Sequence, residues 1–170
     1  SKPIYAMIES IASFIQYFKS VRRRTLNYLR LIPPDKMDWS PKDGEFTCGD
    51  ILHHIIASER MFVGVVVDGK WKYIGHENVE RKGFDESLAL LEAGHIEAMG
   101  RLEKLPVETL LKLRPSINGP SVKAWRWLMA MVEHKIHHRS QLAVYLSLMG
   151  IQPPHIFGLG VEDLIALSVG

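Results

Sequence analysis

Residues 121–149 read SVKAWRWLMAMVEHKIHHRSQLAVYLSLM and carry the longest uninterrupted helical pattern of the chain. No proline or glycine breaks this stretch; Ser121 stands where an N-cap is expected, and Gly150 stands where a helix commonly ends. Positions three and four residues apart share one face of an α-helix. Lys135 and Arg139 are expected to point away from the main stripe. That stripe contains Trp127, Met131, His134, His138, Gln141 and Tyr145.

Three further segments of similar length show the same periodicity, and clusters of proline and glycine separate them. No strand-like alternation is visible. Four amphipathic helices predict an all-α protein, a four-helix bundle formed by a single domain over residues 1–170. Thr47 or Asp50 is expected to cap the second helix. The predicted helices cover residues 4–31, 47–67, 85–105 and 121–149, with a long connection at 68–83 and a candidate short C-terminal helix at 161–167.

The composition excludes several classes of protein. With 46% hydrophobic and 24% charged residues, the chain of 170 residues is typical of a globular domain that buries its own core. A net charge of +2 gives no reason to expect binding to nucleic acid or to a membrane. No apolar run reaches the roughly 18 residues of a membrane-spanning helix. Cys48 is the only cysteine and no signal peptide is recognisable, so we expect a cytoplasmic protein.

His134 and His138 lie one helical turn apart in the middle of an apolar face. Two buried imidazoles need hydrogen-bond partners, and two charged rings would repel each other. A divalent metal ion removes both difficulties, because it binds one nitrogen of each neutral ring. The alternative is a pair of hydrogen-bonded core histidines, or of solvated histidines at a bundle end. The spacing alone does not separate these interpretations.

His54 is the candidate for a third ligand. It lies at the edge of the apolar stripe of the second helix and can turn toward a neighbouring helix, whereas His53 is expected to face solvent. Three imidazoles with open coordination positions would suit Zn, Ni, Fe or Mn, with water or oxygen ligands in the remaining positions.

Other polar residues on the apolar stripes are expected to be structural. A buried Glu59 would need a partner; we expect an ion pair with Arg22, and the alternative is a role as a base or as an acceptor beside a metal ligand. His95 is expected to be a hydrogen-bonded core residue rather than a fourth ligand or a pocket residue. Cys48 is expected to be buried and unreactive, although the helix N-terminus where it lies would lower the pKa of an accessible thiol.

Two residues beyond His138 are candidates for contacts within the site. Gln141 lies on the same face and could hydrogen-bond a bound water molecule or orient a ligand. Tyr145 could donate a hydrogen bond, but a packed aromatic ring is the favoured interpretation. His76 and His155 fall in predicted loops, where solvated side chains are expected.

With these residues placed, the sequence resembles the DinB/YfiT-like superfamily of metalloenzymes. In the second of three matching stretches, a histidine precedes an acidic residue by five positions, and this spacing selects His54 over His53. The third stretch is similar to the signature His-x-x-x-His-Arg-Gly-Gln, with Ser140 where glycine is usual; serine is small, so the ligand geometry should survive. The three stretches are IPPDKMDWSP (32–41), DILHHIIASE (50–59) and EHKIHHRSQL (133–142).

The resemblance implies a particular bundle. Its helices would run up, down, down and up, with a long connection between the second and third, where residues 68–83 lie. Members of the superfamily are often dimers, so a homodimer is expected. Val132, Ile136 and Ala143 form a second apolar strip that would suit such an interface, or would be covered by a neighbouring helix or the C-terminal tail.

The resemblance also implies a range of activities. Members with assigned activities include transferases and an isomerase that use low-molecular-weight thiols. We therefore expect a metal-dependent thiol transferase that acts on a small-molecule electrophile, with such a thiol as co-substrate. The alternatives are a metal-dependent hydrolase and a non-catalytic metal-binding module associated with stress. The resemblance assigns His54, His134 and His138 as ligands and no residue as catalytic.

Overall fold

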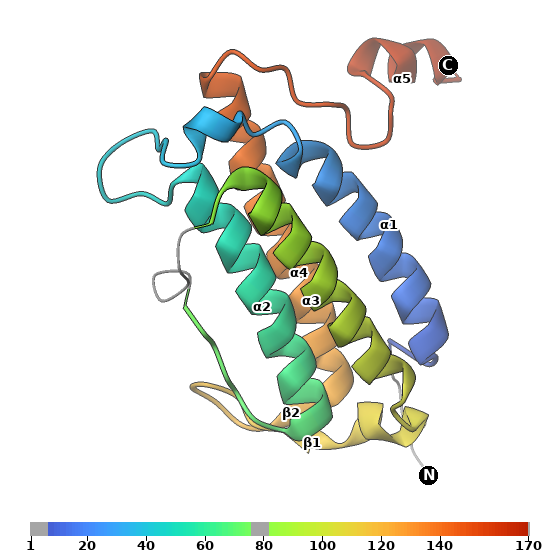
Figure 1. Ribbon diagram of the computed structural model, residues 1–170. Helices are drawn as coiled ribbons and strands as arrows, with labels where there is room; N and C mark the ends of the chain where they lie inside the picture. Colours follow the sequence, from blue (N-terminus) through green and yellow to red (C-terminus); the bar gives the residue numbers. More distant parts are fainter. Residues whose placement is uncertain (1–6, 76–81, 170) are drawn as a thin grey trace.

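The structure, a computed structural model, describes residues 7–75 and 82–169. Figure 1 shows α1 and α4 running in one direction and α2 and α3 in the other, with the connection between α2 and α3 returning along the bundle. This is the predicted up-down-down-up four-helix bundle with a short C-terminal helix. The helices are α1 (Ile11–Leu29), α2 (Cys48–Asp68), α3 (Phe84–Glu103), α4 (Ala124–Leu148) and α5 (Val161–Leu167).

Two predicted helix ends are confirmed by their local hydrogen bonds. Thr47 caps α2 in a reciprocal arrangement with Asp50: its hydroxyl accepts from the Asp50 N–H (3.0 Å), and the Asp50 carboxylate accepts from the Thr47 N–H (2.9 Å). Gly150 follows α4 with a φ of +80°, the left-handed conformation in which a glycine commonly ends a helix.

The first helix starts later than predicted. It begins at Ile11 rather than at residue 4, because the Ser10 hydroxyl accepts a hydrogen bond from the Ser13 N–H (3.2 Å) and caps the helix there. Residues 4–6 of the predicted segment lie outside the described residues. The periodicity of the sequence extended the helix past a capping residue that the pattern alone did not identify.

The fourth helix also starts later, and Ser121 is not its cap. Two short strands precede it: β1 (Leu113–Arg114) pairs antiparallel with β2 (Val122–Lys123), and α4 begins directly after β2. The side chain of Arg114 donates to the carbonyl of Val66 at 2.9 Å and so ties this small ladder to the end of α2. Strands of two residues are too short to give an alternating sequence pattern.

The core consists of two apolar clusters, one toward each end of the bundle, with buried polar residues between them. Phe18, Val66, Leu102 and Leu128 are fully buried in the cluster beside β1 and β2, and Leu29, Leu52 and Leu146 are fully buried in the other. The buried polar residues between them include Thr25, Ser58, Glu59, His95, Lys135 and Arg139.

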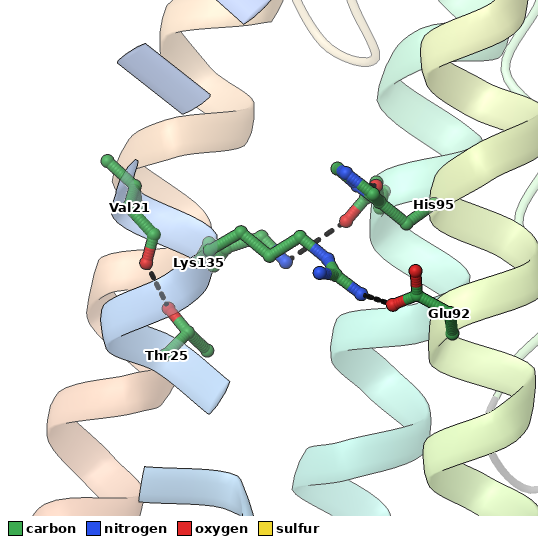
Figure 2. A network of polar contacts seen from close by, with 7 residues as sticks. Val21, Thr25, Glu92, His95 and Lys135 are labelled. Carbon is green, nitrogen blue, oxygen red and sulfur yellow. Dashed lines mark hydrogen bonds and ion pairs between the residues drawn. The ribbon is translucent and has the colours of Figure 1, made fainter. Parts of the chain in front are cut away.

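Glu59 is the centre of this polar layer. Its carboxylate accepts from Nζ of Lys135 on α4 at 3.0 Å and from Nδ1 of His95 on α3 at 2.7 Å, and all three side chains are at most 8% exposed. Figure 2 shows Lys135 extending from α4 toward His95. Burial raises the pKa of Glu59, but attraction to Lys135 and the hydrogen bond from His95 outweigh burial and bring the pKa to about 2.

These contacts correct two predictions. Glu59 does not pair with Arg22, which instead forms an ion pair with Glu92 on α3. Lys135 and Arg139 do not point away from the bundle; both are buried. Because α4 packs against α1 as well as α2, two of its sides are covered, and a single apolar stripe reveals only one of them.

His53 is buried, which corrects its predicted exposure. Its Nε2 lies 3.0 Å from the Ser87 hydroxyl on α3. The reason is again that α2 is covered on two sides, by α3 and by α4. His95, by contrast, is the hydrogen-bonded core residue that the sequence predicted.

The C-terminal segment lies along one end of the bundle and leads to α5, which Figure 1 shows apart from the four long helices. Two contacts attach the segment to α1: the Tyr28 hydroxyl donates to the carbonyl of Pro154 (2.6 Å), and the guanidinium of Arg24 lies 5.0 Å from the ring centre of Phe157. All residues of α5 are exposed.

The second apolar strip of α4 is largely covered within the chain. Val132 belongs to one core cluster and Ala143 packs against the other, while Ile136 is exposed. The homodimer therefore stays a prediction without support from this strip. Among the described residues, no helix is both long and apolar enough to cross a membrane.

The polar layer around Glu59 predicts a large effect of Lys135→Met on stability. Removing this cation would leave the Glu59 carboxylate buried without its main partner, and the free energy of unfolding should fall by about 3–5 kcal/mol. Urea unfolding followed by circular dichroism measures the change. Lys19→Met, on the exposed side of α1, is the matched control and should change stability by less than about 0.5 kcal/mol. Equal effects of the two substitutions would contradict the assignment of Lys135 as the main partner of Glu59.

Candidate metal centre

Three histidines converge between α2 and α4. His54 projects from α2, and His134 and His138 project from successive turns of α4. Nε2 of His54 lies 2.9 Å from Nε2 of His134, and one ring nitrogen from each of the three residues lies within 4.8 Å of the others. The ring centre of His138 is 4.5 Å from both other ring centres. The structure thus brings together the three residues that the sequence predicted as metal ligands.

Two of the three histidine rings form a hydrogen bond through Nδ1, the ring nitrogen that faces away from the cluster. Nδ1 of His54 lies 2.7 Å from the hydroxyl of Tyr73, and Nδ1 of His138 lies 2.9 Å from Oε1 of Gln141. Because a side-chain amide oxygen only accepts, Nδ1 of His138 carries the hydrogen, and its Nε2 keeps a free lone pair. This pattern, one nitrogen donating to an oxygen and the other free, is typical of histidine that ligates a metal.

Gln141 is itself held in place. Its amide nitrogen donates to the hydroxyl of Tyr145 (3.4 Å), and that hydroxyl donates to the carbonyl of Phe46 (2.8 Å). The ring of Tyr145 is buried, as the favoured interpretation of the sequence required, and its hydroxyl completes a chain of contacts that begins at His138. Gln141 therefore has the orienting position that was predicted for it.

The imidazoles of His134 and His138 are neutral at neutral pH. Burial lowers the pKa of His134, the neighbouring rings of His138 and His54 lower it further, and it reaches about 3. Burial also lowers the pKa of His138, partly offset by the hydrogen bond to Gln141. Neutral imidazole is the form that binds metals, so a divalent ion would not compete with an added proton on these two rings.

Aromatic side chains surround the cluster. The ring of Phe46 lies 5.4 Å from that of His54, and the ring of Phe62 lies 5.6 Å from that of His134. Phe46 and Tyr73 were missed from the sequence, because they lie outside the helices and so outside any periodic pattern. The one available signal was the presence of aromatic residues in otherwise polar connections.

The remaining candidates stand apart from the cluster. Cys48 is fully buried, and burial raises its pKa to about 11, so it is the unreactive thiol that was predicted. Glu59 is engaged by Lys135 and His95 rather than by the cluster. His155 is exposed, as expected, and His76 lies outside the described residues.

The donor set fits a divalent transition metal ion. Zinc and similar ions take imidazole nitrogens, and three protein ligands leave room for a further molecule. Among the described residues, the cluster of potential ligands contains His54, His134 and His138 and no carboxylate or thiolate. A site with three neutral ligands would leave the full charge of the ion available to polarise whatever binds beside them.

Proteins of known sequence and structure resemble this chain over most of its length. The uncharacterized protein YjoA of Bacillus subtilis is 26% identical over 139 residues, which are 80% of this chain and 88% of that protein. The crystal structure of YjoA has a TM-score of 0.69 and 22% identity, covering 85% of this chain and 96% of that chain.

Two further crystal structures share the fold. A DinB-like protein from Bacillus cereus has a TM-score of 0.75 at 17% identity, covering 88% of this chain and 99% of that one. YfiT from Bacillus subtilis, a probable metal-dependent hydrolase with an unusual four-helix bundle topology, has a TM-score of 0.67 at 17% identity, covering 89% and 95% of the two chains. The model of the DinB family matches residues 7–165, nearly the whole chain, and this protein therefore belongs to the DinB family.

Proposed function

We propose that this protein is a metal-dependent enzyme that transfers a small thiol to an electrophile. His54, His134 and His138 would hold one divalent transition metal ion. The observation that carries the proposal is the convergence of three imidazoles whose outer nitrogens, in two cases, are already hydrogen-bonded.

An open coordination position favours an enzyme over a structural metal site. Structural zinc sites usually have four protein ligands, whereas catalytic sites keep a position for water or substrate. The three histidines are only half-buried, so a small molecule can reach them from solvent. A non-catalytic metal-binding module would instead require a further protein ligand.

The surroundings favour a thiol over water as the nucleophile. A divalent ion lowers the pKa of a thiol or of a water molecule that binds to it. Hydrolysis also commonly needs a base that accepts a proton from water. Glu59, the buried carboxylate of the polar layer, is neutralised by Lys135 and His95 and is a poor base. A thiol has a lower intrinsic pKa than water and has less need of a base.

The residues of this chain would then have distinct roles. The three histidines would bind the metal ion. Gln141 and Tyr73 would fix the orientation of two of the histidine rings. Phe46 and Phe62 would provide an apolar surface that limits the access of water. Zn, Ni, Fe and Mn are all compatible with this donor set.

Metal-dependent hydrolysis is the second candidate. The observation in its favour is the shared fold with YfiT, a probable metal-dependent hydrolase. The same open position would serve water in place of a thiol.

The double substitution His134→Ala, His138→Ala should abolish metal binding, because it removes two of three ligands. Protein purified without a nickel column is dialysed against zinc and its metal content measured. The matched control is His137→Ala, His155→Ala, which removes two exposed histidines and should leave about one zinc ion per chain. Equal metal content in the two variants would refute the site.

Gln141→Leu should weaken zinc binding by about 10- to 100-fold while the fold stays intact, since His138 would lose the contact that orients its ring. Competition with a fluorescent zinc chelator gives the affinity. Gln16→Leu, on the exposed side of α1, is the control and should bind zinc as the unmodified protein does. An unchanged affinity of the Gln141 variant would show that this contact does not support the metal.

The metal-loaded protein should accelerate the reaction of a low-molecular-weight thiol, such as glutathione or cysteine, with chlorodinitrobenzene. The expected rate is at least about 100-fold above that of the His134→Ala, His138→Ala variant, the scale of a single positioned catalytic group. Absorbance of the conjugate reports the rate. Cleavage of nitrophenyl acetate without any thiol, in the absence of conjugation, would favour hydrolysis, and no metal-dependent rate in either assay would favour a binding module.

A further inference from the structure

A cavity lies beside α2, on a different side of this helix from the metal centre. It has a volume of about 960 Å³ and is bounded by α2, α3 and the extended segment 70–74. Figure 1 shows this segment, coloured green, returning alongside α2. We call the cavity the α2–α3 groove. Its described lining includes His53 but none of the three histidines of the metal centre, so it is a separate site.

The segment 70–74 is a wall with two faces. Lys70, Lys72 and Ile74 line the groove, whereas the hydroxyl of Tyr73 bonds His54 of the metal centre. This alternation is the ordinary property of extended backbone, in which successive side chains point to opposite sides. Trp71 also borders the groove, but its ring packs against Phe62 and Trp127, with ring centres 6.1 Å and 4.7 Å away, and its Nε1 donates to the carbonyl of Pro115 at 2.8 Å. The segment therefore contributes side chains both to the groove and to the surroundings of the metal centre.

The groove combines apolar walls with an excess of positive charge. Ile56, Val63, Leu90 and Ala98 supply apolar surface. The charged lining residues are four cations, Arg60, Lys70, Lys72 and Arg101, and two carboxylates, Asp68 and Glu97.

The two arginines are already neutralised. Arg60 pairs with Glu97 at 3.3 Å and Arg101 pairs with Asp68 at 2.5 Å, both across α2 and α3. Lys70 and Lys72 form no ion pair with any residue in the described part of the chain. They are exposed, and they stand on the same side of one extended segment. The excess charge of the groove is therefore concentrated on these two lysines, at its rim.

We propose that the α2–α3 groove binds a small organic anion with an apolar body. The body would lie against the apolar walls, and the anionic group would lie between Lys70 and Lys72. The volume is within the range of about 300–1,000 Å³ that is usual for small-molecule sites. The proposal does not depend on metal binding or on the proposed transferase activity.

Two dyes that share one ring system test the proposal on the metal-free full chain. Anilinonaphthalene sulfonate carries an anionic group, and N-phenylnaphthylamine lacks it; both fluoresce when bound to apolar surface. The sulfonate should bind saturably to one site per chain. The double substitution Lys70→Glu, Lys72→Glu should lower the affinity for the sulfonate by at least about tenfold. It should lower the affinity for the neutral dye by less than about twofold, because only the anion contacts the lysines.

Two variants provide the controls. Lys19→Glu, Lys36→Glu makes the same change of net charge at exposed positions outside the groove and should not alter binding. Gly64→Leu fills the groove from α2: a Cβ at Gly64 would meet only the carbonyl of Lys70, at 3.9 Å, and leucine favours a helix more than glycine does. This variant should lower the affinity for both dyes by at least about tenfold, without loss of thermal stability.

Three results would overturn the proposal. The first is sulfonate binding that is unchanged by Lys70→Glu, Lys72→Glu, since the dye would then lie on another surface, such as exposed α5. The second is equal weakening by Lys19→Glu, Lys36→Glu, which would indicate general attraction to a basic protein. The third is binding of both dyes that is unchanged by Gly64→Leu.

Discussion

The bundle is organised around one buried carboxylate, that of Glu59. Desolvation of a charge is costly, and the cost is met only where opposite charges and donors surround the group on all sides. Here Lys135 of α4 and His95 of α3 supply them, so three helices are fixed to one another at a single point between two apolar clusters. Apolar packing tolerates small shifts along a helix axis, but a buried ion pair does not, because a displaced partner leaves an unpaired charge in the core.

The same constraint sets the geometry of the metal centre. His54 lies five residues before Glu59 on α2, and His134 directly precedes Lys135 on α4. A shift of α4 by one turn would separate Lys135 from Glu59 and, in the same movement, would separate His134 from His54. The polar layer and the histidine cluster thus depend on one alignment of the antiparallel helices α2 and α4. The ion pair between Glu59 and Lys135 stabilises this alignment and so also keeps the ligand nitrogens of His54 and His134 together.

The sequence predicted those features that repeat along one helix, and it failed where two elements had to be considered together. The spacing of His134 and His138 and the phase of His54 depend only on helix geometry, and the resemblance selected the same residues. Lys135 and His53 were assigned to the surface because a stripe identifies one buried side of a helix, whereas α2 and α4 are each covered on two. The pairing of Glu59 with Lys135, and not with Arg22, depended on the relative rotation of separate helices, which no local pattern contains.

The connection between α2 and α3 is a further case in which the local sequence did not predict the contacts of individual residues. Its polar, glycine-containing sequence predicted only a long link, yet Tyr73 contacts a ligand of the metal centre while Lys70 and Lys72 line the α2–α3 groove. An extended segment acquires such a double role once both of its sides are covered, because alternate side chains then enter different environments. Lys72 and Tyr73 are adjacent in the chain, so the groove and the metal centre share one stretch of backbone although no side chain of the segment is known to contact both.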